Sequence, residues 1–274
     1  MPGERVVAAP AVSVLMGVHN GAPWIGRAVE SVLGQTLADL ELIVVDDGST
    51  DATPTLLAAT RDSRLIVERQ SRAGLARALN RALARARAPL IARLDADDMA
   101  LPDRLARQRA FLDSHPAVGL LGTAARVVDE SDREVGAIRP PEDDDAIRRA
   151  LIRRNPFVHS SVMLRRALVE KSGGYDVSFA VAQDYDLWLR MSRITRMANL
   201  AEPLVVRRLV AGRVTAERDS DRLRAEARAR WRAVGQGGYP LWCAIFVARP
   251  LCALALPSAL RGLVRRAFRP APAG

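Results

Sequence analysis

Short apolar runs alternate with helix-period segments through the first hundred residues, and this alternation limits the possible fold more than any other feature. The runs at 12–18, 40–45, 64–67 and 90–94 are short and continuous, as is typical of strands buried on both faces. Between them, 24–33 and 74–88 carry apolar residues at helical spacing. The pattern predicts an α/β fold in which a mostly parallel sheet is covered by helices on both faces.

Two further helices fit the same rhythm. One passes through Leu56 and Leu57, and Ser49 or Thr50 offers a hydroxyl that could cap its first turn. The other begins near Pro102, after the fourth strand.

Polar clusters follow three of the predicted strands. They are His19–Asn20, Asp46–Asp47 and Asp95–Asp98. Because the carboxyl ends of parallel strands meet at one edge of a sheet, where such folds bind ligands, we expect the clusters to converge. The chain has no GxGxxG after its first strand and no GxxxxGK[ST], so neither dinucleotide nor P-loop phosphate binding is supported.

The third cluster contains an Asp-x-Asp turn. Asp95 and Asp97 place two carboxylates where they suit a hard divalent cation, and such an ion can bridge a nucleotide diphosphate. The alternative is a solvated acidic turn that caps the following helix. The Asp-x-Asp turn directly follows a buried strand, and this position favours the metal site.

Several segments together resemble family 2 glycosyltransferases, which have the GT-A fold. These segments are VSVLMGVHN (12–20), SVLGQTLADLELIVVDDGSTD (31–51), GLARALNRALARARAPLIARLDADDMALPDRLARQ (74–108), NPFVHSSVMLRR (155–166), GGYD (173–176) and AQDYDLWLR (182–190). The resemblance implies inverting transfer of a sugar from a nucleotide diphosphate-sugar, dependent on Mg²⁺ or Mn²⁺, with a UDP-sugar favoured. The acceptor would be a hydroxyl of a glycan or a lipid-linked molecule.

The same resemblance assigns the donor side. His19 lies where the family often has an aromatic residue that packs on the base, and Asn20 belongs to the same turn. Asp47 corresponds to the carboxylate that reads the edge of uracil or a similar base, or it simply holds the turn. Asp95 corresponds to the position near the ribose and the metal, and Asp97 to the direct metal ligand. Arg77 reaches the diphosphate, unless it belongs to the solvated face of its arginine-rich helix.

On the acceptor side, the resemblance assigns the general base to Asp184. His159 lies near the acceptor or diphosphate, or is structural. Trp188 forms an acceptor platform, or is a buried indole. Many relatives carry a histidine where this chain reads RRLVAGRVT (207–215), and Arg208 or Arg213 could supply a positive charge there instead.

The last quarter of the chain carries most of the net charge. Residues 201–274 contain 14 basic and 5 acidic residues, whereas the first 200 are nearly neutral and the whole chain is +10. Within this region, 241–260 is apolar apart from Arg249, which precedes Pro250, and four arginines follow. We therefore divide the chain into a catalytic domain, 1–215, and a basic, apolar helical tail, 216–274.

We expect the tail to lie on an anionic membrane surface, because Arg249 and Pro250 at the midpoint of the apolar segment make spanning costly. A helical pair docked on the catalytic domain and a true span are the alternatives. Nucleic acid is not an expected partner, since the basic residues are interleaved with aliphatic rather than aromatic side chains. The N-terminus lacks a signal-peptide pattern, which predicts a cytoplasmic enzyme, peripheral on the inner face of the cell membrane.

Two other functions stay open. A nucleotidyltransferase also combines an α/β sheet with a carboxylate-bound metal, but it usually has a glycine-rich or lysine-bearing phosphate loop, which this N-terminal region lacks. A non-catalytic scaffold that binds anionic membrane would turn over no nucleotide sugar.

Overall fold

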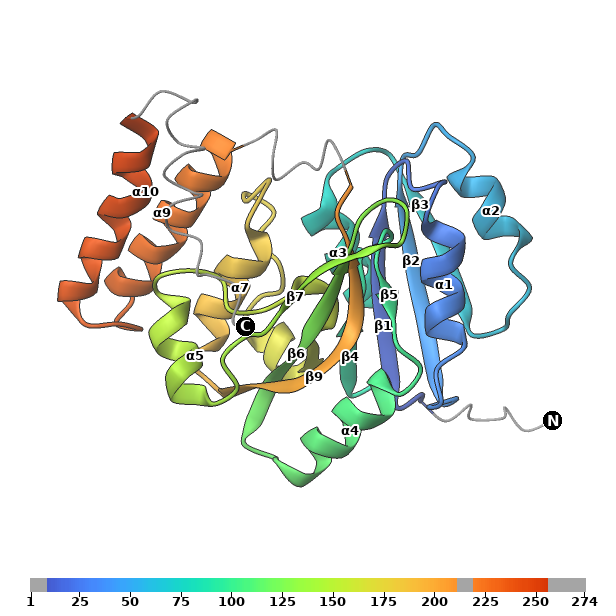
Figure 1. The fold of residues 1–274 in the computed structure, drawn as a ribbon, viewed down its shortest axis with the longest axis horizontal. Helices are drawn as coiled ribbons and strands as arrows, with labels where there is room; N and C mark the ends of the chain where they lie inside the picture. Colours follow the sequence, from blue (N-terminus) through green and yellow to red (C-terminus); the bar gives the residue numbers. More distant parts are fainter. Residues whose placement is uncertain (1–8, 211–218, 256–274) are drawn as a thin grey trace, which may run out of the picture.

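The computed structural model describes residues 9–210 and 219–255, which form one mixed β-sheet flanked by helices (Figure 1). The strands are β1 Val12–Val18, β2 Leu40–Asp47, β3 Leu65–Gln70, β4 Leu90–Arg93, β5 Met99–Ala100, β6 Val118–Val128, β7 Glu134–Ile138, β8 Met163–Arg165 and β9 Arg196–Arg208. The α-helices are α1 Ile25–Leu33, α2 Thr53–Ala59, α3 Leu75–Arg85, α4 Arg104–Ser114, α5 Asp144–Leu151, α6 Arg166–Lys171, α7 Gln183–Met191, α9 Asp219–Gly235 and α10 Ile245–Ala255. Two short 3₁₀ turns are η1 His159–Ser161 and η2 Leu241–Ala244.

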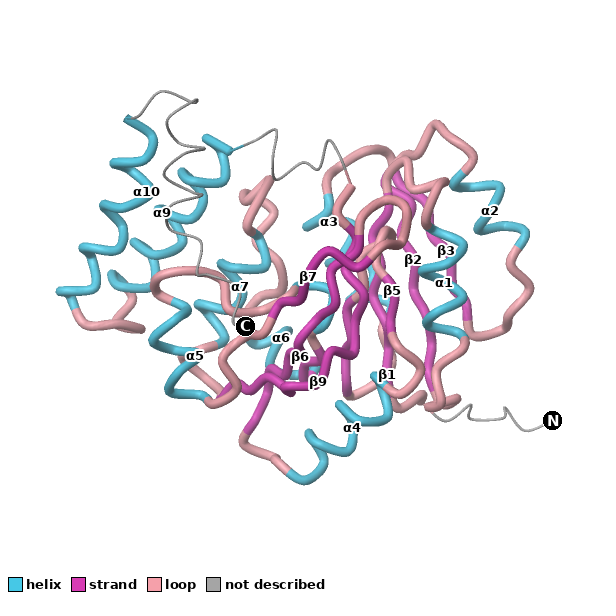
Figure 2. The backbone as a smooth tube through the Cα atoms, viewed as in Figure 1, coloured by secondary structure: helices cyan, strands magenta, loops and turns pink. Residues whose placement is uncertain are grey.

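The sheet has a parallel half and a mixed half. Its strand order is β3-β2-β1-β4-β8-β6-β9-β5, and β7 pairs with β6. The neighbours within β3-β2-β1-β4 are parallel, as the sequence predicts. Strand β8 is antiparallel to both β4 and β6. Strands β6 and β9 are parallel to each other and lie side by side in Figure 2. The four predicted strands therefore form one side of a larger sheet.

Each face of the sheet packs its own apolar core, which explains why the strands are apolar throughout. Leu15 and Ile43 face one way, toward α3, α7 and part of α9. Val14 and Leu42, next to them along the strands, face α1 and α4 on the other side. The predicted helices on both faces are confirmed.

Two local details differ from the expectations. Helix α2 begins at Thr53, and no side chain caps it at its N-cap residue. The predicted Ser49 or Thr50 cap is wrong because the carboxylate of Asp51 accepts from the Thr53 amide instead, at 3.0 Å. Helix α3 ends at Arg85 rather than Ala88, because Ala86 is already extended; Pro89 itself restricts only Ala88, the residue directly before it.

The C-terminal helices are docked on the body of the protein. Ala229 and Ala233 of α9 belong to the same core as Trp188 of α7. Arg232 of α9 forms ion pairs with Asp176 and Asp186, at 2.8 and 3.0 Å. Helix α9 is therefore docked on the catalytic body. In the segment to which the docked alternative applies, 241–260, Cys243 is buried beside Ile152 and Val234, and residues 256–260 lie outside the described residues. The expected boundary at 215/216 falls in 211–218, outside the described residues.

The helices that the structure describes include none with the length and apolar character needed to cross a membrane.

Gly48, directly after β2, provides a test of the turn that carries Asp47. Its φ is +73°, and a Cβ there would lie 2.8 Å from the backbone nitrogen of Arg72. We expect Gly48→Ala to lower the free energy of unfolding by about 2 kcal/mol, because both the left-handed backbone and the contact become unfavourable. Urea unfolding measures this change.

Gly26, in α1, is the matched control, since a Cβ there meets nothing within 4 Å. Gly26→Ala should leave stability unchanged or raise it by up to about 1 kcal/mol through helix propensity. Equal effects of the two substitutions would contradict the described turn.

Candidate active site

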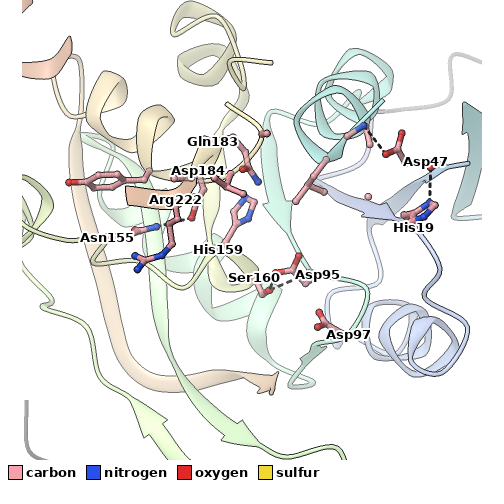
Figure 3. Close-up of a pocket in the computed structure, with 18 of the residues that line it drawn as sticks. His19, Asp47, Asp95, Asp97, Asn155, His159, Ser160, Gln183, Asp184 and Arg222 are labelled. Atoms are coloured by element: carbon pink, nitrogen blue, oxygen red, sulfur yellow. Dashed lines mark hydrogen bonds between the residues drawn. The ribbon is translucent and has the colours of Figure 1, made fainter. Parts of the chain in front are cut away.

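A cavity of about 620 Å³ lies at the carboxyl ends of β1, β2 and β4, where the sequence places its polar clusters. Figure 3 shows two groups of side chains facing each other across it. One group comes from the parallel half of the sheet and includes His19, Asp47 and Asp97. The other comes from the segment before η1, from α7 and from α9, and includes Asp184 and Arg222.

The turns after β1 and β2 are joined by hydrogen bonds. His19 Nδ1 donates to the carbonyl oxygen of Asp47, at 3.0 Å. The side-chain oxygen of Asn20, whose φ is +52°, accepts from the backbone amide of Thr50, and the backbone amide of Asn20 donates to the Ser49 hydroxyl. His19 lines the cavity, whereas Asn20 does not and is exposed. Asn20 thus connects the two turns from outside the cavity.

Asp47 lines the cavity and also organises the loop before α3. One of its oxygens accepts from the Gln70 side chain and the Ala73 amide, both at 2.7 Å, and the other accepts from the Gly74 amide at 2.8 Å. A carboxylate has about four acceptor positions, so these bonds leave room for one further donor. Asp47 can therefore hold the loop and still contact a ligand.

The Asp-x-Asp turn is part of a group of three carboxylates. Asp95, Asp97 and Asp98 each place an oxygen within 4.8 Å of the others. The Ser160 hydroxyl lies 2.8 Å from Asp95 Oδ2 and 2.5 Å from Asp98 Oδ2, and its single proton serves only one of them at a time. Crowded carboxylate oxygens of this kind are the donors that Mg²⁺ and Mn²⁺ take in proteins, so the residues present fit a divalent cation.

His159 lies beside this cluster and is neutral. Burial, and next the positive charge of Arg93, lower the pKa of its imidazole to about 3, although Asp95 opposes them. Its Nε2 lies 3.0 Å from the hydroxyl oxygen of Tyr175. The side chain lines the cavity, and the neutral imidazole can donate or accept a hydrogen bond there without adding a charge.

Asp184 is the carboxylate on the opposite side of the cavity. Burial raises the pKa of its carboxyl group, and Asp95 adds to this effect. The amide of Asn155 donates to Asp184 Oδ2 at 2.7 Å, which favours the ionised form and limits the rise. A carboxylate that lines a cavity with a raised pKa suits a general base.

Three of the residues singled out from the sequence are turned away from the cavity. Trp188 is fully buried and packs edge-on against Phe157 and His159, so the acceptor platform is wrong and the buried indole holds. Arg77 is exposed on α3 and does not line the cavity, which leaves it on the solvated face. Arg208 is buried, and its guanidinium group lies over the Trp24 ring. Arg213 lies outside the described residues.

The cavity contains basic and acidic residues that the sequence did not single out. Arg72 lies in the loop before α3, Arg207 near the end of β9, and Arg222 and Glu226 on α9. Arg222 pairs with Glu226 at 2.5 Å. Among these residues, only the position of Arg72 could have been recognised from the sequence, because it lies two residues before Gly74, where the predicted helix begins. The others reach the cavity through long-range packing.

A comparison with known protein families assigns the chain to one of them. Residues 13–173, more than half of the chain, match the family described as glycosyl transferase family 2. The chain belongs to this family. It is an enzyme that uses nucleotide sugars, with an acidic Asp-x-Asp cluster at its site.

Two relatives show how far the similarity extends. EpsE of Bacillus subtilis is 31% identical over 264 residues, which cover 92% of this chain and 91% of that protein. The amylovoran biosynthesis glycosyltransferase AmsE of Erwinia amylovora is 32% identical over 79% of this chain and 83% of its own length. In both, the similarity extends across most of the chain.

Solved structures share the fold, which is GT-A-like. TarS 1-349 of S. aureus in complex with UDP-GlcNAc matches 80% of this chain and 66% of its own, with a TM-score of 0.66 and 21% identity. The mannosyltransferase PcManGT of Pyrobaculum calidifontis, in complex with GDP-Man and Mn²⁺, matches 96% of this chain and 81% of its own, with a TM-score of 0.63 and 23% identity.

The Asn155–Asp184 contact yields a test. Asn155→Ala removes a donor to the ionised carboxyl group, so the pKa of Asp184 should rise further. We expect the acid limb of kcat/KM to move to higher pH by about half to one unit, equivalent to one hydrogen bond. Mn²⁺-dependent hydrolysis of UDP-GlcNAc or GDP-mannose, followed from pH 4 to 9, measures the limb.

Gln70→Ala is the control, because its amide donates to Asp47 instead, at the same distance of 2.7 Å. The acid limb should stay in place in this variant. A limb that shifts equally in both variants, or in neither, would show that Asp184 is not the group that titrates.

Proposed function

We propose that this enzyme transfers a sugar from a nucleotide diphosphate-sugar to a hydroxyl of a glycan or lipid-linked acceptor, with inversion, in the assembly of a bacterial surface polysaccharide. The observation that carries the proposal is the pairing of an acidic cluster with a separate buried carboxylate, Asp184, across one cavity. The name of AmsE, a relative in amylovoran biosynthesis, supports a polysaccharide product.

The donor is proposed to occupy the half of the cavity next to the parallel strands. Asp47 retains one acceptor position, which suits the N–H of uracil's imide edge, so a UDP-sugar is favoured. His19 would stack on the base, and Arg72 carries a charge suited to phosphate oxygens. The structure of TarS in complex with UDP-GlcNAc supports a uracil nucleotide. The structure of PcManGT in complex with GDP-Man makes a guanine nucleotide the alternative to test.

Asp97 and Asp95 are the residues that would hold Mg²⁺ or Mn²⁺. When bound, such an ion stabilises the negative charge of the departing diphosphate. Asp98 is tied back into the fold, because its Oδ1 accepts from the backbone amide of Arg208 at 2.9 Å. Asp98 therefore shapes the turn while Asp97 faces the cavity.

Asp184 is proposed to take the proton of the acceptor hydroxyl as that oxygen attacks the anomeric carbon. The attack comes from the face opposite the diphosphate, and a single displacement inverts the configuration. Burial raises the pKa of the carboxyl group and makes it a stronger base, while Asn155 keeps it ionised and oriented. Gln183, its neighbour in the sequence, adds no like charge.

Two substitutions test these roles. Asp97→Asn and Asp184→Asn should each reduce sugar transfer by about 10²-fold or more, through loss of a metal ligand and of the general base respectively. The unfolding temperature should remain close to that of the unaltered protein, because neither side chain lies in the apolar cores. Release of the nucleotide diphosphate from a radiolabelled donor provides the assay.

The two variants should differ in donor binding. Asp97→Asn should weaken cation-dependent binding of the nucleotide, whereas Asp184→Asn should leave it unchanged. Full activity in Asp184→Asn would remove the assignment of the base.

The enzyme is proposed to work on the cytoplasmic face of the membrane, held by its C-terminal helices. Leu241, Ile245 and Trp242 expose 81%, 68% and 66% of their surface, and Trp231 and Leu251 are also exposed. The chain beyond residue 255 adds four arginines and no acidic residue. Exposed apolar side chains beside basic sequence suit a bilayer surface that carries anionic headgroups.

Vesicle flotation tests this location. The protein should bind vesicles that contain phosphatidylglycerol more tightly than neutral ones, and Trp242→Ser with Ile245→Ser should weaken binding by about tenfold or more. Ile194→Ser, at an exposed apolar residue between α7 and β9, is the control and should bind normally. Unchanged binding in the double variant would contradict the docking surface.

A further inference from the structure

Arg93 is a fully buried cation next to the acidic cluster. It is the last residue of β4, two positions before Asp95, and has 0% of its surface exposed. Its Nη2 donates to Asp95 Oδ1, while Nε and Nη1 have no hydrogen-bond partner among the described residues. Burying a guanidinium group that is only partly paired costs free energy, so a purely structural role explains this residue poorly.

The contacts around Arg93 fix it and Asp95 in place. Arg104, also buried, donates to the Arg93 carbonyl at 2.8 Å and to that of Val162 at 3.2 Å. The second oxygen of Asp95 lies 2.8 Å from the Ser160 hydroxyl. Both oxygens of Asp95 therefore have partners, and one of these partners carries a full positive charge.

We propose that Arg93 is a positioning residue that orients Asp95 and offsets one negative charge of the cluster, so that a divalent cation binds weakly until the donor's diphosphate adds its own oxygens. The inference rests on the proposed function, since it takes the cluster as the site of the cation. It concerns how cation and nucleotide depend on each other.

The physical reason is electrostatic. A buried positive charge repels a divalent cation strongly, because the surrounding protein screens the repulsion less than water does. The negative diphosphate offsets this repulsion, so nucleotide and cation each increase the affinity for the other. Without Arg93, Asp95 would keep an unbalanced charge that a cation alone could neutralise.

Substitution at Arg93 separates charge from shape. Arg93→Gln keeps a side chain that can donate to Asp95 but removes the charge, whereas Arg93→Lys keeps the charge. The affinity for MnCl₂ alone, measured by calorimetry and by the shift of the unfolding temperature, should be about tenfold higher in Arg93→Gln and near normal in Arg93→Lys. UDP should raise Mn²⁺ affinity less in Arg93→Gln than in the unaltered protein.

Arg165→Gln is the matched control. Arg165 lies on β8, and its guanidinium group donates only to backbone carbonyl oxygens among the described residues, including those of Val118 and Leu112. Its loss should lower the unfolding temperature and leave Mn²⁺ affinity unchanged. Normal or weaker Mn²⁺ affinity in Arg93→Gln would overturn the proposal, because a merely structural arginine would behave like Arg165.

A double variant covers the case in which Arg93→Gln does not fold. Removing the unbalanced carboxylate as well, with Asp95→Asn, should restore folding, and failure of the double variant to fold would overturn the proposal. The proposed function fails by a different result. In that case the unaltered protein would bind neither Mn²⁺ nor UDP even when both are present, a result that does not involve the Arg93 variants.

Discussion

Mutual repulsion among three carboxylates is the constraint on which the rest of the site depends. Asp95, Asp97 and Asp98 occupy one turn after β4, and like charges this close raise the free energy of the folded chain unless donors oppose them. These donors include Arg93 on β4, the Ser160 hydroxyl in η1 and the Arg208 backbone amide at the end of β9. They meet only when both halves of the sheet have assembled.

The mixed half of the sheet therefore contributes directly to the site. Strand β8 joins β4 to β6, and it directly follows the segment that carries His159 and Ser160. Helix α9 covers α7, and Arg230 of α9 contacts the Tyr185 hydroxyl at 2.9 Å, beside Asp184. A group from the last quarter of the chain thus supports the helix that presents the proposed base.

Part of the C-terminal positive charge is used inside the fold. Arg230 and Arg232 are turned inward, where they contact Tyr185, Asp176 and Asp186. These arginines are paired within the body of the enzyme, so their charges are not available to a membrane surface. Net charge counted along the sequence does not distinguish paired from solvent-facing arginines.

Local pattern predicted the parallel half of the fold and the edge of the sheet at which the polar clusters converge. The β-branched runs at 12–18 and 40–45 are strands because both faces are buried, and the polar residues after them converge as expected. The insertion of β8 and the inward turn of Trp188 depend on contacts between distant segments. Sequence spacing carries no information on such contacts, so Ser160, Arg222 and the orientation of Arg208 could not be predicted.

Binding of nucleotide sugars is the most direct test of the account, because every proposed role depends on a donor held next to a cation. Calorimetric titration of UDP-, GDP- and dTDP-sugars, each with and without Mn²⁺, measures it. The account predicts that at least one donor binds, that a UDP-sugar binds best, and that binding needs the cation. Failure of every donor to bind, or binding of equal strength without the cation, would contradict it.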